Sequence, residues 1–319
     1  MTYTFYTLHS RMLNLLASIH HRLGEVQARH LQQPPPELER AYHVSAVHAT
    51  LAIEGGQLAP LPVAELVSKP ATGGKPEALE AVNTHRAHDL LPGLDPFLAL
   101  DFRHAHGVMM HGLALDAGQY RTGPMDVLYG DPPPLRTAPA DNIPTQVEEL
   151  LHFVENDENP AIITSCVLHF GLIYLRPFTA GNGRMARLWQ RRVLMEQWPV
   201  FAFLPVEAFI LRTQAAYHAA LEYADRREDC GNFIIYMMER IDEALAEVLT
   251  TRNPVLQGPD RMTLFLRQAP PRAFSRKDYL NFYPELSTAS ASRDLARAVA
   301  EGLVQMAGTK RQARYERRR

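Results

Sequence analysis

The chain has 319 residues, of which 46% are hydrophobic and 21% are charged, and its formal net charge is −2 at pH 7. This composition excludes a disordered or low-complexity chain, and the length accommodates one large domain and a smaller one. The longest apolar stretch, from Pro199 to Leu211, is interrupted by Pro and Glu and is too short to cross a membrane. The N-terminus lacks the layout of a signal peptide, so we expect a cytoplasmic protein without a membrane partner.

Two features stand out in the first half of the chain. In "TLAIEGGQL", residues 50–58, a glutamate at a helix end precedes two glycines, which on its own is a common way to end a helix. Residues 120–144, "YRTGPMDVLYGDPPPLRTAPADNIP", combine a β-leaning "MDVLYG" with several prolines. Because these prolines exclude a helix, the stretch predicts a short hairpin or flap between two helices.

Most of the following chain has the periodicity of helices. Apolar residues recur at three- and four-residue spacing in the segments 145–156, 159–175, 184–197, 212–227 and 231–252. The main domain is therefore predicted to be mainly α. The Pro- and Gly-containing stretch "TRNPVLQGPD" after the last segment indicates a linker.

The stretch "RPFTAGNGRMAR" separates the second and third of these helices. Gly181 and Gly183 permit the close approach of a ligand, and Asn182 tolerates left-handed backbone angles and offers an amide. The N–H groups of "GNGR" would point into one small space together with the positive end of the helix dipole. Arg184 and Arg187 are three residues apart, so both guanidinium groups can reach that space. The sequence therefore predicts a phosphate-binding loop.

The C-terminal segment is basic. From Arg272 to Arg319 it holds eleven Lys or Arg and five Asp or Glu. "SRKDYLNF" predicts a short helix, "SASRDLARAVAEGLVQ" an amphipathic helix, and "AGTKRQARYE" a two-stranded wing. This charge suits an acidic partner such as nucleic acid, although a solvated, disordered end has the same composition.

Neither cysteine nor histidine indicates a metal centre. Cys166 and Cys230 lie in apolar, helix-like segments, which is typical of buried free thiols in a reducing compartment. The fourteen histidines are scattered, and the pair His43 and His48 lacks Cys or carboxylate partners at ligand spacing. The same is true of "HAH", which begins at His104, so no metal site is expected.

The loop and its two flanking helices resemble the Fic (filamentation induced by cAMP) family. The family signature reads HPFx(D/E)GNGRxxR in a loop between two buried helices. Pro177, Phe178, the segment Gly181 to Arg184, and Arg187 match this signature. "QYRTGPMDVLYG" is similar to the "GxYR" sequence that precedes the family's flap hairpin, which positions a target segment.

The N-terminal stretch extends the resemblance. Thr50, Glu54 and Gly55 fit the (S/T)xxxE(G/N) motif of Fic proteins that carry an inhibitory helix in the same chain. In the family the inhibitory glutamate pairs with the second motif arginine and blocks the γ-phosphate of ATP. The resemblance therefore implies that Glu54 pairs with Arg187.

The resemblance implies a mainly α fold with three parts. We expect an N-terminal helical region with the inhibitory motif over residues 1–95 and a Fic core over 96–250. The core would be a Fic-type helical bundle with a short β-hairpin flap. Residues 251–319 resemble the C-terminal winged helix-turn-helix domain that many Fic proteins carry.

The activity of the family is AMP transfer, usually from ATP, to a hydroxyl of a protein Ser, Thr or Tyr. The family's histidine accepts the hydroxyl proton and its acidic residue holds Mg²⁺, but here Arg176 and Ala180 occupy these positions. Arginine stays protonated and alanine cannot bind a metal, so we expect strongly reduced transfer and no Mg²⁺. The nucleotide-binding set remains: Gly181, Asn182, Gly183, Arg184 and Arg187. Arg176 could itself hold phosphate in place of the metal.

The winged-helix resemblance implies a DNA-binding surface. The second helix would enter the major groove, and the wing would contact phosphate. The residues expected to face DNA are Ser290, Ser292, Arg293 and Arg297 on the helix and Lys310, Arg311 and Arg314 on the wing. A winged helix used only for packing or for a homodimer is the alternative.

Three hypotheses on function follow. The preferred one is a catalytically degenerate Fic protein that binds ATP or another nucleotide and acts as a DNA-binding transcriptional regulator. The second is an active protein adenylyltransferase that takes its base from elsewhere, such as His169, Asp126 or Asp131. The third is an interaction protein whose flap receives a peptide strand of a target protein by edge pairing.

Overall fold

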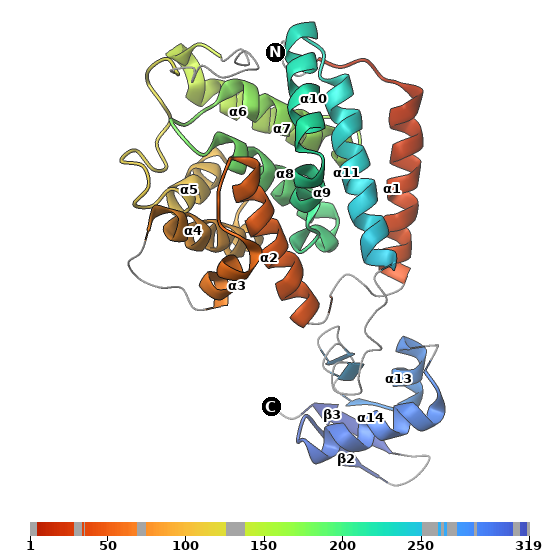
Figure 1. Cartoon of the computed structure of the whole chain (residues 1–319). Helices are drawn as coiled ribbons and strands as arrows, with labels where there is room; N and C mark the ends of the chain where they lie inside the picture. The colour runs from red at the N-terminus through yellow and green to blue at the C-terminus, as the bar shows by residue number, and fades with distance from the viewer. Residues whose placement is uncertain are drawn as a thin grey trace. The chain divides into compact units, whose positions relative to one another are not determined.

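The computed structural model describes residues 5–28, 34, 36–68, 75–125, 138–250, 261–262, 265–266, 273–283, 286–308 and 313–317. The chain divides into two compact units, one within residues 1–32 and 38–250 and the other within 33–37 and 251–319 (Figure 1). Among the described residues, the first unit contains helices only, whereas the second combines helices with a small sheet.

The larger unit is an assembly of helices. Its α-helices are α1 (Ser10–Ala28), α2 (Pro36–Ile53), α3 (Pro60–Ser68), α4 (Pro76–Leu90), α5 (Ala99–Met109), α6 (Ile143–Asn156), α7 (Ala161–Leu175), α8 (Asn182–Gln197), α9 (Val206–Arg212), α10 (Gln214–Arg227) and α11 (Gly231–Thr250). Short 3₁₀ helices are η2 (Leu91–Gly93), η3 (Ala140–Asn142) and η4 (Pro199–Ala202). The five segments with helical periodicity correspond to α6, α7, α8, α10 and α11, which confirms the prediction of a mainly α fold.

Helix α7 is the central element of the larger unit. All of its residues except Ala161 and Tyr174 are buried, because the sequence is apolar on every side of the helix. It packs against α6, α8 and α11, and α1 lies alongside α11 (Figure 1). Burial on all sides fixes the position of the C-terminal end of α7, where the predicted phosphate-binding loop begins.

Helix α8 is buried although it carries four arginines, and buried charges have to be paired. Arg191 donates to both carboxylate oxygens of Glu207, at 3.3 Å and 2.5 Å, and to the carbonyl of Phe201 at 2.7 Å. Arg192 donates from Nε to the carbonyl of Leu94 at 2.7 Å. These contacts anchor the middle of α8, while the other two arginines, nearer its N-terminus, belong to the loop.

In its described residues, the smaller unit combines helical segments with a three-stranded antiparallel sheet. The elements are β1 (Ala273–Phe274), α13 (Arg276–Phe282), α14 (Thr288–Ala300), β2 (Val304–Ala307) and β3 (Arg314–Arg317). The strand order is β1-β3-β2, with Phe274 opposite Tyr315 and Met306 opposite the same residue on the other side. Phe265, Phe274 and Tyr279 belong to its separate apolar core.

Polar contacts fix α13 and α14 of the smaller unit. Ser275 and Asp278 form a capping box at the start of α13, and Ser287 caps α14. Asp294 is buried and accepts two hydrogen bonds from Arg261, at 2.7 Å and 3.0 Å, and one from the Tyr279 hydroxyl at 3.1 Å. An antiparallel pair of strands follows α14, but β2 begins within the stretch that was predicted as the end of the second helix, and the winged helix stays a prediction.

Several sequence-based predictions fall outside the described residues. These are the central part of the flap (126–137) with Asp126 and Asp131, the linker (251–260), and Lys310 and Arg311 of the wing. Cys166 and Cys230 are both buried and both free, as predicted. None of the helices in the described part of the chain is long and apolar enough to span a membrane.

Candidate functional site

The loop between α7 and α8 is built on left-handed turns. Arg176 caps α7 with φ 42° and ψ 64°, and Gly181 caps the start of α8 with φ 77°. Left-handed geometry costs an arginine about 1–2 kcal/mol, whereas glycine adopts it freely. Because α8 begins at Asn182, its first N–H groups and the positive end of its dipole lie at this loop.

Asn182 holds the loop in shape. Its Oδ1 accepts a hydrogen bond from the Phe178 amide at 2.9 Å, and its Nδ2 donates to the Phe178 carbonyl at 2.7 Å. Both polar atoms of this buried side chain are therefore engaged within the loop. The sequence indicated that the amide would be offered to a ligand, but the structure uses it to fix the backbone.

His106 of α5 supports the loop through two hydrogen bonds and a ring contact. Its Nδ1 accepts from the Gly118 amide at 2.9 Å, so its Nε2 carries the proton and donates to the Ala180 carbonyl at 3.0 Å. Its ring stacks on Phe178, with centroids 3.5 Å apart and planes 3° from parallel. Burial lowers the pKa of His106 to about 4, which keeps the ring neutral at pH 7. The sequence does not predict this supporting role.

Arg121 ties the end of α7 to the chain that leads into the predicted flap. It is 4% exposed and donates to four carbonyl oxygens. Two of them belong to Leu175 and Arg176, at 3.0 Å and 2.7 Å, and the others to Gly123 and Ala138. A buried guanidinium is satisfied best by several acceptors, so this arginine of the "YR" pair has a structural reason to lie here.

Glu54 lies directly over the loop. Helix α2 ends at Ile53, and the chain turns at Gly55 with φ 88°, which leaves Glu54 beside the start of α8. Its Oε1 is 2.7 Å from Nη2 of Arg187. A β carbon on Gly183 would come within 2.2 Å of the same Oε1, so only glycine allows this approach.

Thr50 completes the contact one turn earlier on α2. Its hydroxyl accepts from Arg187 Nε at 2.8 Å, and its carbonyl accepts from Arg187 Nη2 at 3.0 Å. Arg187 is 3% exposed and Thr50 is 2% exposed, so solvent reaches this group of contacts only at the Glu54 carboxylate. The structure therefore brings Arg187 to Thr50 and Glu54, which lie 137 and 133 residues before it in sequence.

Arg184 lies beside the loop and is incompletely paired. Its Nη2 is 3.1 Å from Glu80 Oε1 on α4 and 3.4 Å from Met110 Sδ, a side chain that also borders Gly181. Its Nε and Nη1 are buried and have no hydrogen-bond partner among the described residues. Leaving buried donors unpaired costs about 1–3 kcal/mol, and an anion in the loop would supply the missing acceptors.

The charges around Glu54 and Arg187 favour the ionised form of each side chain. Burial acts to raise the pKa of Glu54, but Arg187, Arg184 and His218 outweigh it and hold that pKa below its ordinary value of 4.5. Although burial alone would lower it, the pKa of Arg187 is raised, chiefly because Glu54 stabilises its charge. Glu54 is thus a carboxylate at neutral pH and competes with any other anion for Arg187.

The two positions that depart from the Fic signature differ in their surroundings. Arg176 is half-buried; burial lowers its pKa, while the carboxylates of Glu54 and Asp225 act in the opposite direction. Ala180 is exposed and contributes only its backbone, whose carbonyl is held by His106. Neither side chain can accept a proton or bind a metal ion.

His169, a candidate substitute base, does not face the loop. It is fully buried in α7, with Nδ1 2.7 Å from Gln190 Oε1 and Nε2 2.9 Å from the Tyr217 hydroxyl. Burial lowers its pKa to about 3. Because both nitrogens are engaged inside the core, His169 cannot take a proton from a substrate at the loop.

Comparison with known proteins places this arrangement in one family. Residues 96–194 match the profile of the Fic/DOC family. The structure of a Fic family protein from Desulfovibrio desulfuricans G20 superimposes with a TM-score of 0.73 at 27% identity, covering 98% of this chain and 97% of that one. The chain contains a Fic/DOC domain.

Other Fic proteins match over shorter spans. The protein adenylyltransferase fic-1 of Caenorhabditis briggsae is 29% identical over 124 residues, which are 36% of this chain and 23% of that protein. This chain therefore matches about a quarter of the length of its curated relatives. Fic-1 of Caenorhabditis elegans (residues 134–508) shares the fold, with a TM-score of 0.62 at 20% identity over 75% of this chain and 72% of that one.

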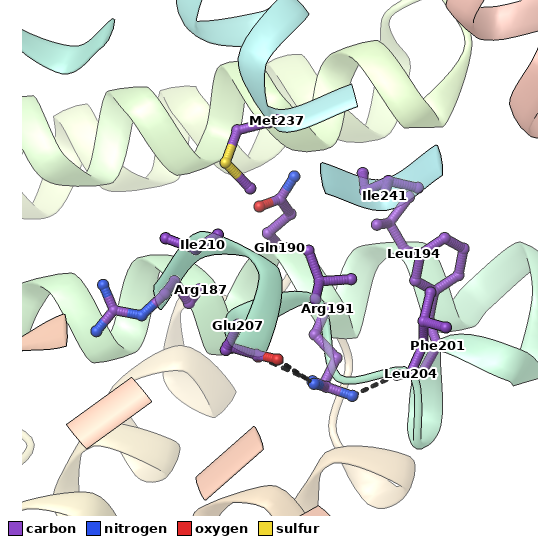
Figure 2. A pocket seen from close by; sticks show the side chains of 11 residues that line it. Arg187, Gln190, Arg191, Leu194, Phe201, Leu204, Glu207, Ile210, Met237 and Ile241 are labelled. Carbon is purple, nitrogen blue, oxygen red and sulfur yellow. Dashed lines mark hydrogen bonds and ion pairs between the residues drawn. The ribbon is translucent and has the colours of Figure 1, made fainter. Parts of the chain in front are cut away.

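A small cavity behind α8 is not part of the Fic loop. It has a volume of about 20 Å³, enough for about one water molecule, so it is too small for a nucleotide. Figure 2 shows the guanidinium of Arg187 pointing away from Met237 and Ile241, while Arg191 is tied to Glu207. Arg187 therefore lines the cavity with its carbon stem and directs its charge to the other side, toward Glu54.

In the smaller unit, the residues predicted to face DNA lie mainly on α14. Arg293 and Arg297 are exposed and one turn apart, and Arg297 pairs with Glu301 at 2.7 Å. The Ser290 hydroxyl accepts hydrogen bonds from Ser287 and Arg293. The Ser292 hydroxyl accepts one from Arg276 of α13 at 3.0 Å. Arg276, which we did not predict, thus joins this face. Arg314 on β3 is exposed and 3.9 Å from Asp278.

Proposed function

We propose that this Fic protein binds a nucleotide through the α7–α8 loop, that Glu54 restrains this binding, and that AMP transfer is strongly reduced. The observation that carries the proposal is the contact of Glu54 with Arg187 over Gly183. A carboxylate at this place occupies the position that phosphate oxygens would take at the N-terminus of α8. Its removal would free Arg187 for a ligand.

The residues around the loop fit a phosphate group. The N-terminus of α8 supplies N–H groups, and the left-handed turn at Gly181 permits close approach. Arg184 supplies two buried N–H groups that lack an acceptor in the described part of the chain. Together with Arg187, these groups could hold two or more phosphate oxygens in a partly desolvated setting.

The same residues do not fit Mg²⁺. The acidic position of the signature is Ala180, which offers no side-chain oxygen. The nearby carboxylate of Asp116 accepts a hydrogen bond from the Thr179 hydroxyl at 2.9 Å. We therefore propose that nucleotide binding does not depend on Mg²⁺ and that Arg176 contributes a positive charge instead.

The loop also lacks a proton acceptor for transfer chemistry. Loss of a general base typically lowers a rate about 10²- to 10⁴-fold. Arg176 stands at the histidine position and His169 is sequestered in the core. Nucleotide binding with little turnover is therefore the function that the geometry supports best, in preference to an active adenylyltransferase.

The direct test is calorimetric titration of ATP, with and without Mg²⁺, into the wild-type chain and into Glu54→Gly. We expect binding at least tenfold tighter in Glu54→Gly and no more than twofold dependence on Mg²⁺. Glu158→Gly, an exposed glutamate outside any helix, is the matched control and should behave as wild type. Absence of ATP binding in both wild type and Glu54→Gly would refute the proposal.

A second function, DNA binding by the smaller unit, is supported by its charge and by the face formed by Arg276, Arg293 and Arg297. Two exposed arginines one turn apart on α14 suit contacts to a phosphate backbone or to base edges. We propose that this unit is a winged helix that binds duplex DNA and couples the Fic unit to transcription. Capture of a peptide by the flap depends on residues outside the described ranges and stays a prediction.

A further inference from the structure

A cluster of three histidines lies between α2 and α4. His43 of α2 places Nε2 2.7 Å from Nδ1 of His85 on α4, with ring centroids 4.8 Å apart. His88, one turn after His85, packs edge-on against His43 with centroids 5.6 Å apart. The two helices are thus joined by imidazole groups, which are common metal ligands.

A carboxylate completes the cluster. Asp89 Oδ2 lies 3.4 Å from Nε2 of His85, and one ligand atom each from His43, His85 and Asp89 lies within 4.8 Å of the others. The His85 side chain is 17% exposed and that of Asp89 is 59% exposed. The cluster is therefore closed on the protein side and open to solvent at Asp89, which provides a path for an ion and room for water ligands.

The two imidazoles and the carboxylate suit a metal ion of intermediate softness. Two imidazoles and one carboxylate, with water in the remaining position, are typical of Zn²⁺ and related first-row ions. Ligand atoms of a tetrahedral zinc site lie about 3.3–3.5 Å apart, given bonds of about 2.0–2.1 Å. The two histidine nitrogens, now 2.7 Å apart, would have to separate by about 0.6–0.8 Å, and the exposed Asp89 would rotate inward.

We propose that His43, His85 and Asp89 bind a divalent transition-metal ion such as Zn²⁺, and that this ion ties α2 to α4. The positive charge of Arg191 acts on this region, but Glu207 neutralises it through a contact of 2.5 Å. The site is separate from the Fic loop, because its ligands on α2 and α4 are not the residues that contact the loop arginines.

The location of the site gives it a regulatory consequence. Helix α2 leads directly into Glu54, the partner of Arg187, and α4 carries Glu80, the partner of Arg184. An ion that holds α2 on α4 would hold both carboxylates on the loop arginines. This consequence rests on the proposed function, because it concerns access of a nucleotide to those arginines, whereas metal binding itself does not.

The test is titration of Zn²⁺ into the full-length chain after treatment with a chelator. We expect one strongly bound ion per chain and at least tenfold weaker binding in His43→Gln, His85→Gln and Asp89→Asn. His152→Gln is the matched control, because His152 is exposed on α6 and lies 3.9 Å from Glu155 without a second histidine. Failure of the wild-type chain to bind Zn²⁺, or unchanged binding in His85→Gln, would overturn the proposal.

Thermal unfolding separates a lost ligand from a lost fold. Saturating Zn²⁺ should raise the melting temperature of the wild-type chain by about 5 °C and leave that of Asp89→Asn unchanged. Asp89 is largely exposed, so its replacement should not impair folding. A rise in Asp89→Asn equal to that of the wild type would count against the site.

Titration of ATP tests the regulatory step independently. Zn²⁺ should weaken ATP binding to the wild type and have a smaller effect in Glu54→Gly, which keeps only the contact of Glu80 with Arg184. If the chain bound Zn²⁺ but never ATP, the metal site would stand and the proposed nucleotide function would fail. Equal ATP affinity with and without Zn²⁺ in the wild type would refute the coupling alone.

Discussion

Glu54 lies so close to Gly183 that a β carbon on the glycine would come within 2.2 Å of the Glu54 carboxylate. The two residues are far apart in sequence, and their approach depends on the end of α2 and the start of α8 meeting at one point. Because a side chain at residue 183 would displace the Glu54 carboxylate, the contact of Glu54 with Arg187 and the glycine are physically coupled. Substitutions at the two positions should therefore not act independently.

The first prediction concerns this coupling. Gly183→Ala should destabilise the wild-type chain by about 1–3 kcal/mol, because the new methyl group displaces Glu54 or strains the loop. In a Glu54→Gly background the same change should cost less than about 1 kcal/mol. Urea unfolding of the four chains gives the coupling free energy directly. Equal costs in both backgrounds would show that the methyl group is accommodated without moving Glu54.

The second prediction concerns pH. The folded-state pKa of Glu54 lies below 4.5, so its contact with Arg187 is complete above pH 4.5 and is lost as the pH falls through the lowered pKa. The ratio of ATP affinities between Glu54→Gln and wild type should therefore be constant from pH 7 to pH 5 and approach one in more acidic solution. Calorimetry across this range measures the ratio. A ratio that falls steadily between pH 7 and pH 5 would contradict the assignment.

The third prediction concerns the support of the loop. His106→Leu removes the hydrogen bonds to Gly118 and Ala180, so it should destabilise the chain by about 1–3 kcal/mol and weaken ATP binding. His104→Gln, an exposed histidine two residues away on the same helix, should change neither property. Chemical unfolding and ATP titration of both variants provide the measurement. Unaltered ATP affinity in a folded His106→Leu chain would remove this histidine from the site.

The fourth prediction concerns the missing chemistry. Arg176→His combined with Ala180→Asp, in a Glu54→Gly background, should raise the rate of AMP incorporation from labelled ATP with Mg²⁺ at least about 100-fold. The matched control is Arg176→Gln with Ala180→Asn, which has similar size but neither a base nor an acid. If the parent chain already transferred AMP as fast as the restored variant, the chain would be an active enzyme.

The fifth prediction concerns the smaller unit. Arg293→Ala should weaken binding to duplex DNA and reduce the slope of log affinity against log salt by about 0.9, the contribution of one phosphate contact. Arg226→Ala removes an exposed arginine of the larger unit and should leave DNA binding unchanged. Fluorescence anisotropy at several salt concentrations tests both. No binding of DNA by the wild-type chain at low salt would rule out this function.

Local pattern was sufficient for much of the fold. The helices α6, α7, α8, α10 and α11 could be predicted because each has a regular apolar repeat, and the loop because glycine and arginine have definite spacings. The pairing of Glu54 with Arg187 followed from a family resemblance and not from any local signal. Residues 133 positions apart meet only through the packing of whole helices.

Other site residues escaped prediction for the same reason. His106 and Arg121 act through hydrogen bonds to backbone carbonyls, and sequence gives no sign of which carbonyl will lie nearby. Sequence spacing likewise gives no partner for His43, because its neighbours in sequence offer none. Its partner, His85, comes from another helix 42 residues later.

The way in which the loop is held has an evolutionary consequence. Arg121 fixes the carbonyls of residues 175 and 176, and Asn182 and His106 fix Phe178 and the carbonyl of Ala180. None of these bonds uses the side chain at position 176 or 180. Both side chains can be exchanged without disturbing the backbone that presents them. Under the proposed function, a lineage could therefore gain or lose AMP transfer through changes at these two positions without passing through an unfolded intermediate.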